Sequence, residues 1–258
     1  MNLPSSLCFL GLVACLPLLR QEQAAEPEAG ALSDPGVWLD AEQGLVGLRA
    51  SVLIKEDLLE YLLVAPNGAA HESLFLTDVS PTLLNAMLLG AGAEAGSNAR
   101  WEEVDPEDVE EGARPYRVLE PEGPPEARFL PYVAWREDGE TYFFRVEDVL
   151  TNLATGRSMR RHPWIYLGSR MASMREGEPQ RFLAEVEGNL INVAFFFEGN
   201  TLLTASLEAC SSQTIWVGNQ ALLPPRETPV VLLFAREPLQ VFPPAWEAHL
   251  EPAKADGD

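Results

Sequence analysis

Short runs of apolar residues, many alternating with polar ones, predict a chain built mainly of β-strands. Val37–Asp40 and Gly44–Ile54 form a first predicted pair around a turn at residues 41–44. Leu59–Val64 is apolar at nearly every position, which indicates a strand covered on both faces. Pro66-Asn67-Gly68 is typical of a turn, so we expect His71–Thr77 to return as the hairpin partner of Leu59–Val64.

The clearest local pattern predicts a helix over about residues 80–90. Ser80 is of a residue type that caps helix N-termini, and Pro81 suits the first helical position. Gly90 and Gly92 end the pattern. Apolar side chains recur between them at helical spacing and form one stripe, at Leu83, Leu84, Met87 and Leu88. We expect this stripe to pack on the sheet.

The second half of the chain again reads as strands. Phe129–Arg136 and Thr141–Val146 flank Asp138-Gly139, which is a strong hairpin signal. Further strands are predicted at Pro163–Leu167, Arg181–Val186, Leu190–Phe197, Thr214–Val217 and Pro229–Ala235. The order of elements favours an α+β fold, mainly antiparallel β-sheet with one main α-helix, in a single domain over residues 37–236.

Acidic residues dominate the charge of the chain. There are 39 acidic and 18 basic residues, for a net charge of −21, which argues against a nucleic-acid partner and against adhesion to anionic lipid. Ten carboxylates lie between Glu102 and Glu126, among five prolines. We interpret residues 101–127 as an exposed acidic insertion suited to contact with a partner, and residues 237–258 as a proline-rich acidic tail.

The N-terminal residues predict export from the cytoplasm. Leu7–Leu19 is an apolar run of the length of a signal-peptide core, and residues 20–36 resemble a disordered tether. Leu12-Val13-Ala14-Cys15 resembles a lipobox, which makes Cys15 the candidate lipidation site. Simple secretion with cleavage near Ala24 or Ala25 is an alternative, because no Lys or Arg precedes the apolar run; an uncleaved anchor or a misassigned start is another. The first two place the protein in the periplasm or on the bacterial envelope.

Several short motifs, taken in order, resemble the YdjY-type domain of bacterial envelope proteins over about Val37–Ala235. They are Leu59-Glu60-Tyr61, His71-Glu72-Ser73, the Ser80-Pro81 helix with its glycine-rich end, Ala134-Trp135-Arg136, Thr155-Gly156 before Pro163-Trp164, Gly168-Ser169 and Gly188-Asn189-Leu190-Ile191. The resemblance implies an envelope protein without an assigned reaction. Relatives described as ferredoxin-like carry cysteine clusters; this sequence has three cysteines, two of them in the leader, so no redox cofactor is implied.

The sharpest candidate for chemistry is His71-Glu72-Ser73, with Asp78 just beyond. These residue types suit a Ser/His hydrolase, and His71 with Asp78, Glu60 or His162 would suit a divalent metal. Their spacing matches no standard zinc motif, and no nucleophile-elbow motif occurs. The alternative is that they only fix the hairpin through hydrogen bonds.

A second candidate is the basic stretch at residues 157–164. Arg160 and Arg161 suit an anionic ligand, with Trp164 as an apolar wall. These arginines would otherwise pair with the acidic insertion or stay solvated. Cys210 is expected to be a small buried hydrophobic residue. The sequence therefore favours a non-enzymatic domain that binds an envelope protein or small ligand, and leaves the hydrolase as its alternative.

Overall fold

The computed structural model describes residues 36–105, 107, 109 and 115–250. All of them belong to one compact unit, Asp34–Asp258. The leader, Cys15, the tether and the last eight residues lie outside the described residues. The described part is mostly β-structure with few helices, which agrees with the predicted α+β class.

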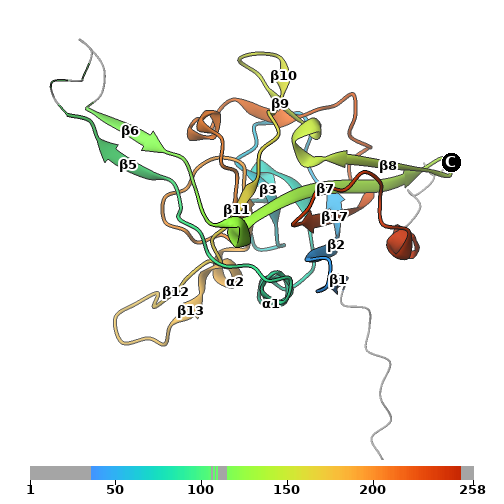
Figure 1. Ribbon diagram of the computed structural model, residues 1–258, viewed down its shortest axis with the longest axis horizontal. Helices are drawn as coiled ribbons and strands as arrows, with labels where there is room; N and C mark the ends of the chain where they lie inside the picture. The colour runs from blue at the N-terminus through green and yellow to red at the C-terminus, as the bar shows by residue number, and fades with distance from the viewer. Residues whose placement is uncertain (1–35, 106, 108, 110–114, 251–258) are drawn as a thin grey trace, which may run out of the picture. The chain divides into compact units, whose positions relative to one another are not determined.

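Eight strands close into a barrel (Figure 1). In sheet order they are β2 (Leu45–Val52), β17 (Pro229–Ala235), β7 (Arg128–Glu137), β11 (Trp164–Tyr166), β15 (Leu203–Thr204), β14 (Asn189–Asn192), β3 (Tyr61–Val64) and β4 (Ser73–Leu76). Pairing of β4 with β2 closes the ring. Two further strands extend the sheet, β1 (Val37–Asp40) on β2 and β8 (Glu140–Arg145) on β7. Within this ten-stranded sheet, β1 and β8 are the edge strands that the described residues show, and closure of the ring limits edge-to-edge association.

Both clear hairpin predictions are confirmed. β1 and β2 pair antiparallel with Asp40 opposite Leu45, and β7 and β8 pair with Glu137 opposite Glu140. Asp138 and Gly139 between them have φ angles of 51° and 82°. Two positive φ values in a two-residue turn match the twist of the flanking strands, which is why Asp-Gly was informative here.

The predicted hairpin between Leu59–Val64 and His71–Thr77 is wrong, because β3 and β4 run parallel. A 3-10 helix, η1 (Ala70–Glu72), follows the Asn67-Gly68 turn and carries the chain back to the start of β3. The backbone at Gly68 also lies against Gly188, where an added Cβ would come within 2.5 Å of the Gly188 carbonyl oxygen. The turn residues thus serve a close contact between segments rather than a two-strand hairpin.

The helix prediction is confirmed by α1 (Pro81–Gly90). The Ser80 hydroxyl accepts a hydrogen bond from the Leu83 amide, and Leu84 and Leu88 are buried. The predicted strand Arg181–Val186 is wrong over most of its length. Only Arg181–Phe182 is a strand, β13, paired with β12 (Met171–Ala172), and α2 (Leu183–Glu187) follows.

Alternating residues of β7 and β17 divide the apolar side chains between two clusters. Val230, Leu232 and Phe234 face the main core inside the barrel, while Val231 and Leu233 face a second cluster outside it. The start of the predicted tail covers that outer cluster. Its residues Phe242 and Leu250 are buried there, on either side of the 3-10 helix η5 (Pro244–His249). The segment up to Leu250 is therefore packed rather than loosely held.

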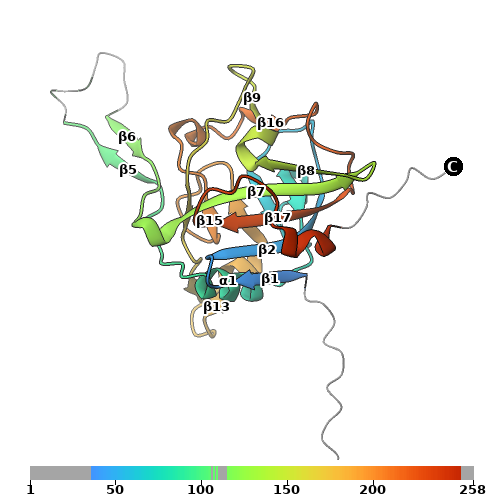
Figure 2. The same ribbon diagram turned by 45° about the vertical axis from the view of Figure 1, so that its right-hand side comes forward.

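The acidic insertion contributes two strands to the fold. Strands β5 (Arg100–Glu103) and β6 (Tyr116–Leu119) form an antiparallel hairpin that stands away from the barrel in Figures 1 and 2. We call it the arm. The remaining elements are the three-stranded sheet β10 (Arg157–Ser158), β9 (Leu150–Asn152) and β16 (Trp216–Gly218), and the 3-10 helices η2 (Pro125–Ala127), η3 (Val146–Val149) and η4 (Glu208–Ser211).

Candidate functional site

The structure does not assemble His71, Glu72 and Ser73 into a nucleophilic site. Ser73 begins β4 with 0% of its surface exposed, and its hydroxyl donates to the Phe75 carbonyl oxygen at 2.9 Å. His71 sits in η1 with a side chain that is 79% exposed, and its Nε2 lies 3.5 Å from Glu72 Oε1. The imidazole therefore faces solvent while the hydroxyl is turned into the core.

The neighbours of His71 are two acidic residues, Glu60 and Glu72. Burial raises the pKa of the Glu60 carboxyl, and the adjacent Glu72 charge raises it further, while His71 acts in the opposite direction. Burial likewise raises the pKa of Tyr61 above its ordinary range. Asp78 lies elsewhere, in the wall of a pocket beside β2. Over the described ranges, no three His, Cys, Asp or Glu side chains gather as metal ligands would.

The structure divides the basic stretch between the core and the surface. Trp164 is completely buried, so it forms no wall of an open cleft. Arg161 is held by Asp148 through two hydrogen bonds, Nη2–Oδ2 at 2.6 Å and Nε–Oδ1 at 3.1 Å. Its partner is thus in η3, not in the acidic insertion. Arg160 is exposed, and its carbonyl oxygen lies 2.8 Å from His162 Nδ1.

Trp164 instead belongs to a buried polar network around Glu147. Glu147 is 0% exposed, and its Oε1 accepts from Trp164 Nε1 at 3.1 Å and from Arg145 Nη2 at 2.7 Å. Its Oε2 has no hydrogen-bond partner among the described residues. Burial raises the pKa of Glu147, and the Arg145 guanidinium opposes that rise. No motif in the sequence marks Glu147, because the acidic pair Glu147-Asp148 is also typical of a surface position.

His162 shares this buried region and stacks on Trp164, with ring centroids 5.6 Å apart. Burial lowers the pKa of His162 to about 4. The imidazole is therefore neutral at pH 7, and its contact with the Arg160 carbonyl places the proton on Nδ1. The buried thiol of Cys210 is as predicted from the sequence, and burial raises its pKa. None of these groups reaches solvent in a cleft.

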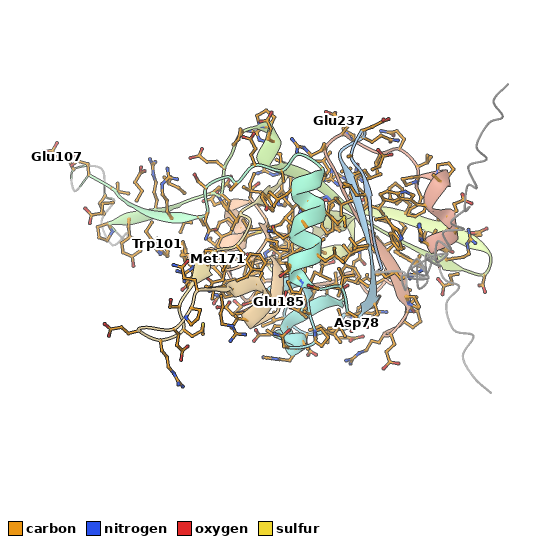
Figure 3. All side chains as sticks on the ribbon, turned by 90° about the horizontal axis from the view of Figure 1, so that it is seen from below. Asp78, Trp101, Glu107, Met171, Glu185 and Glu237 are labelled. Carbon is orange, nitrogen blue, oxygen red and sulfur yellow. The ribbon has the colours of Figure 1, made fainter. Side chains whose placement is uncertain are left out.

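An exposed aromatic cluster joins two residues of the arm to Phe197. Trp101 is 52% exposed, and Tyr116 and Phe197 are each 39% exposed. The Trp101 ring stacks on Phe197 at 5.1 Å between centroids and makes a T-shaped contact with Tyr116 at 5.0 Å. Trp101, Glu103 and Tyr116 together line a shallow pocket. Figure 3 shows Trp101 on the arm, well away from α1.

Strand register explains the cluster. Trp101 lies opposite Val118, and Glu103 lies opposite Tyr116, so Trp101 and Tyr116 are diagonal neighbours on one face. Glu103 is two residues from Trp101 and shares that face. The sequence signal was two aromatic residues flanking the prolines of an acidic segment, which the composition alone obscured.

A second concavity of about 450 Å³ lies beside β2. Asp78 lines this pocket together with residues from other parts of the chain. Its polar side chains are Arg49, Ser51, Thr77, Asp78 and His249.

No protein-family model, curated protein or solved structure matches this chain. The resemblance to YdjY-type domains thus stays a prediction. Among the described residues, no helix has the length and apolar character needed to cross a bilayer.

Proposed function

We propose that this chain is a non-enzymatic binding module of the bacterial envelope, related to YdjY-type domains, that holds a partner protein through its arm. The partner places a lysine or arginine side chain against Trp101, Glu103 and Tyr116. The observation that carries the proposal is the exposed aromatic cluster, which packs outside both apolar cores although Trp is costly to leave in water.

Aromatic residues are the side chains that most often dominate protein interfaces, because they bury a large area with little loss of conformational entropy. Trp101 is held by stacking on Phe197 and by a T-shaped contact with Tyr116. The ring is thus positioned before a partner arrives, which reduces the entropy cost of binding. The arm supplies a defined surface, and the barrel supplies a fixed base.

Charge selects the chemistry of the partner. The arm from Arg100 to Leu119 has seven acidic and three basic residues. Glu102 is paired with Arg117, whereas Glu103 makes no ion pair with any described residue. A carboxylate beside two aromatic rings attracts a cation both by Coulomb attraction and by the quadrupole of the rings. The net charge of −21 adds long-range steering of a basic partner.

The hydrolase alternative has no support in the geometry. A nucleophilic serine needs an accessible hydroxyl within hydrogen-bond reach of a base. Ser73 is buried and donates its proton to a backbone oxygen, and His71 is exposed. The proposal therefore places the functional surface on the arm and not at His71.

A peptide titration tests the arm. The full chain is titrated at low salt with a 12-residue Gly/Ser peptide containing four arginines and with the same peptide containing four glutamines. Binding is followed by NMR at the Trp101 indole N–H, which a Trp101→Phe spectrum assigns. We expect the glutamine peptide to bind at least about 10-fold more weakly, since it offers no cation to the rings.

Matched variants separate the aromatic site from bulk charge. Glu103→Gln and Glu140→Gln each remove one exposed acid, but Glu140 lies at the β7–β8 turn. We expect only Glu103→Gln to weaken the arginine peptide. Equal weakening by both variants would show attraction by net charge alone and would overturn the proposal.

The extracytoplasmic location is proposed from the leader. Fatty-acid labelling of the full chain in a bacterial host tests Cys15 directly. Label that is lost in Cys15→Ser and kept in Cys8→Ser supports a lipid anchor. An unlabelled chain that is cleaved and found in the periplasm supports simple secretion, and an uncleaved chain in the cytoplasm contradicts export.

A further inference from the structure

The pocket beside β2 lies where that strand changes partners. β1 pairs with β2 only as far as Leu48, and β4 pairs with it only from Ser51. In the gap, the Arg49 amide donates to the Gly36 carbonyl at 2.8 Å, and the Arg49 carbonyl accepts from Thr77 Oγ1 at 2.7 Å. The backbone is thus satisfied without a neighbouring strand. The space that a strand would fill is a pocket of about 450 Å³, within the range of small-ligand sites.

Strand alternation sets which side chains form its floor. Leu48, Ala50 and Val52 belong to the core inside the barrel. Arg49 and Ser51, at the intervening positions, project from the outer face and line the pocket. Their side chains therefore meet a ligand from outside the barrel, and the barrel interior stays closed beneath them.

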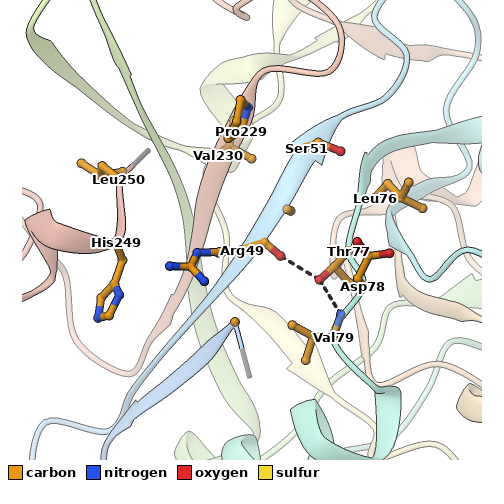
Figure 4. Close-up of a pocket in the computed structure, with 12 residues that line it drawn as sticks. Arg49, Ser51, Leu76, Thr77, Asp78, Val79, Pro229, Val230, His249 and Leu250 are labelled. Atoms are coloured by element: carbon orange, nitrogen blue, oxygen red, sulfur yellow. Dashed lines mark hydrogen bonds between the residues drawn. The ribbon is translucent and has the colours of Figure 1, made fainter. Parts of the chain in front are cut away.

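Two walls of opposite character face each other across this floor. Figure 4 shows Arg49 and His249 on one side and Thr77 and Asp78 on the other. Asp78 is exposed to solvent, and Arg49 is half-exposed. Apolar surface from Leu76, Val79 and Leu250 completes the lining. The site thus offers a cation, an anion and an apolar surface.

Both charged walls are held by their surroundings. The Arg49 guanidinium carbon lies 5.3 Å from the centroid of the Trp38 ring, and His249 stacks on the same ring at 3.7 Å. On the other side, Thr77 Oγ1 donates to Arg49 and accepts from the Val79 amide at 3.1 Å. These contacts fix the loop that presents Asp78. A ligand would then meet charges that are already positioned.

We infer that this pocket binds a zwitterionic small molecule, an amino acid or a short peptide. Its carboxylate pairs with Arg49, its ammonium pairs with Asp78, and its apolar side chain lies against Val79 and Leu250. A guanidinium is suited to a carboxylate because its N–H groups match both oxygens. A ligand with several negative charges is disfavoured by Asp78 and by the net charge of −21. The inference does not depend on the arm.

Three forms of one dipeptide test the inference. The full chain is titrated by NMR with Ala-Leu, with N-acetyl-Ala-Leu, which lacks the ammonium, and with Ala-Leu amide, which lacks the carboxylate. We expect saturable shifts at the pocket residues with Ala-Leu. Each blocked form should bind at least 10-fold more weakly, because one of its two ion pairs is missing.

Variants then assign each end of the ligand. Asp78→Asn should bind Ala-Leu and N-acetyl-Ala-Leu alike, and Arg49→Gln should bind Ala-Leu and Ala-Leu amide alike. Asp57→Asn and Arg157→Gln remove exposed charges outside the pocket and should retain the wild-type preference. If Arg49→Gln fails to fold, Asp78→Asn, at an exposed residue, still tests the pairing of the ligand ammonium with Asp78. Absence of binding, or equal binding of all three forms by the wild type, would overturn the inference. Neither result bears on the arginine peptide at Trp101.

Discussion

Two pairs of tryptophan and glutamate in this molecule have opposite roles. Trp164 and Glu147 lie in the interior, where the indole N–H donates to the carboxylate at 3.1 Å and both side chains are 0% exposed. Trp101 and Glu103 share one face of the arm, where the indole is 52% exposed. The same two residue types thus support the fold in one region and form a candidate binding surface in the other.

The difference between the pairs shows that environment, and not residue type, assigns the role. Inside, losing one partner of a hydrogen bond leaves the other buried and unpaired, which costs more free energy than the bond contributes. On the arm, water solvates Glu103, so no structural need fixes that residue type there. Replacing the inner pair should therefore change stability, and replacing the outer pair should change binding.

The largest effect is expected for Trp164→Ala. Removing this completely buried ring leaves a cavity in the main core and costs about 3–5 kcal/mol of the free energy of unfolding. Urea unfolding followed by circular dichroism measures the change. A loss below about 1 kcal/mol would show that the site collapses or that the core does not need the ring.

Glu147→Ala should destabilise by a similar amount, about 3–5 kcal/mol, because Arg145 is left buried without its partner. Glu147→Gln keeps an oxygen that accepts from Trp164 and should cost less. The exposed counterpart, Glu103→Ala, should change the free energy of unfolding by no more than about 0.5 kcal/mol. Equal costs for Glu147→Ala and Glu103→Ala in the same urea assay would remove the distinction between the pairs.

Protonation of His162 should make the inner region sensitive to acid. Burial lowers its pKa from 6.5 to about 4, so the unfolded chain takes up the proton first as the pH falls. Above about pH 7, His162 does not change the free energy of unfolding. As the pH falls from 6.5 to 4, His162 lowers the free energy of unfolding by about 3 kcal/mol in total, and this loss is constant below pH 4. Urea unfolding of wild type and His162→Gln across this range isolates it. Parallel curves for the two proteins would contradict the prediction.

Among the buried residues considered, the smallest effect is expected at Ser73. Ser73→Ala removes one hydrogen bond to the Phe75 carbonyl oxygen and should cost about 1 kcal/mol of the free energy of unfolding. The wild-type hydroxyl is buried, so a fluorophosphonate probe for nucleophilic serines should leave this residue unlabelled. Labelling that disappears in Ser73→Ala would revive the hydrolase alternative.

Local patterns predicted local structure well. The Ser80-Pro81 start of α1 and the Asp138-Gly139 turn each rest on backbone preferences of a few neighbouring residues. Closure of the barrel could not be predicted this way, because it depends on β4 meeting β2 after η1 reverses the chain. The same limit explains the parallel pairing of β3 with β4.

Burial of individual side chains was the other limit for the site. The sequence marked Trp164 as a possible ligand wall, but the structure buries it completely. The sequence placed Trp101 in an exposed insertion without predicting the strand on which it lies. Burial of Trp164 follows from β11 pairing with both β7 and β15, which are distant in sequence. Order in the arm follows from cross-strand contacts such as Arg117 with Glu102, which composition does not reveal.

One variant, measured for both stability and binding, tests the central claim that the barrel is a scaffold and the arm is the binding surface. For Trp101→Ala in the full chain, urea unfolding and the arginine-peptide titration are measured on the same sample, with shifts of arm backbone amides reporting binding. We predict a change in the free energy of unfolding below about 1 kcal/mol, together with at least a 10-fold loss of affinity. A loss of about 3 kcal/mol or more with unchanged affinity would contradict the account.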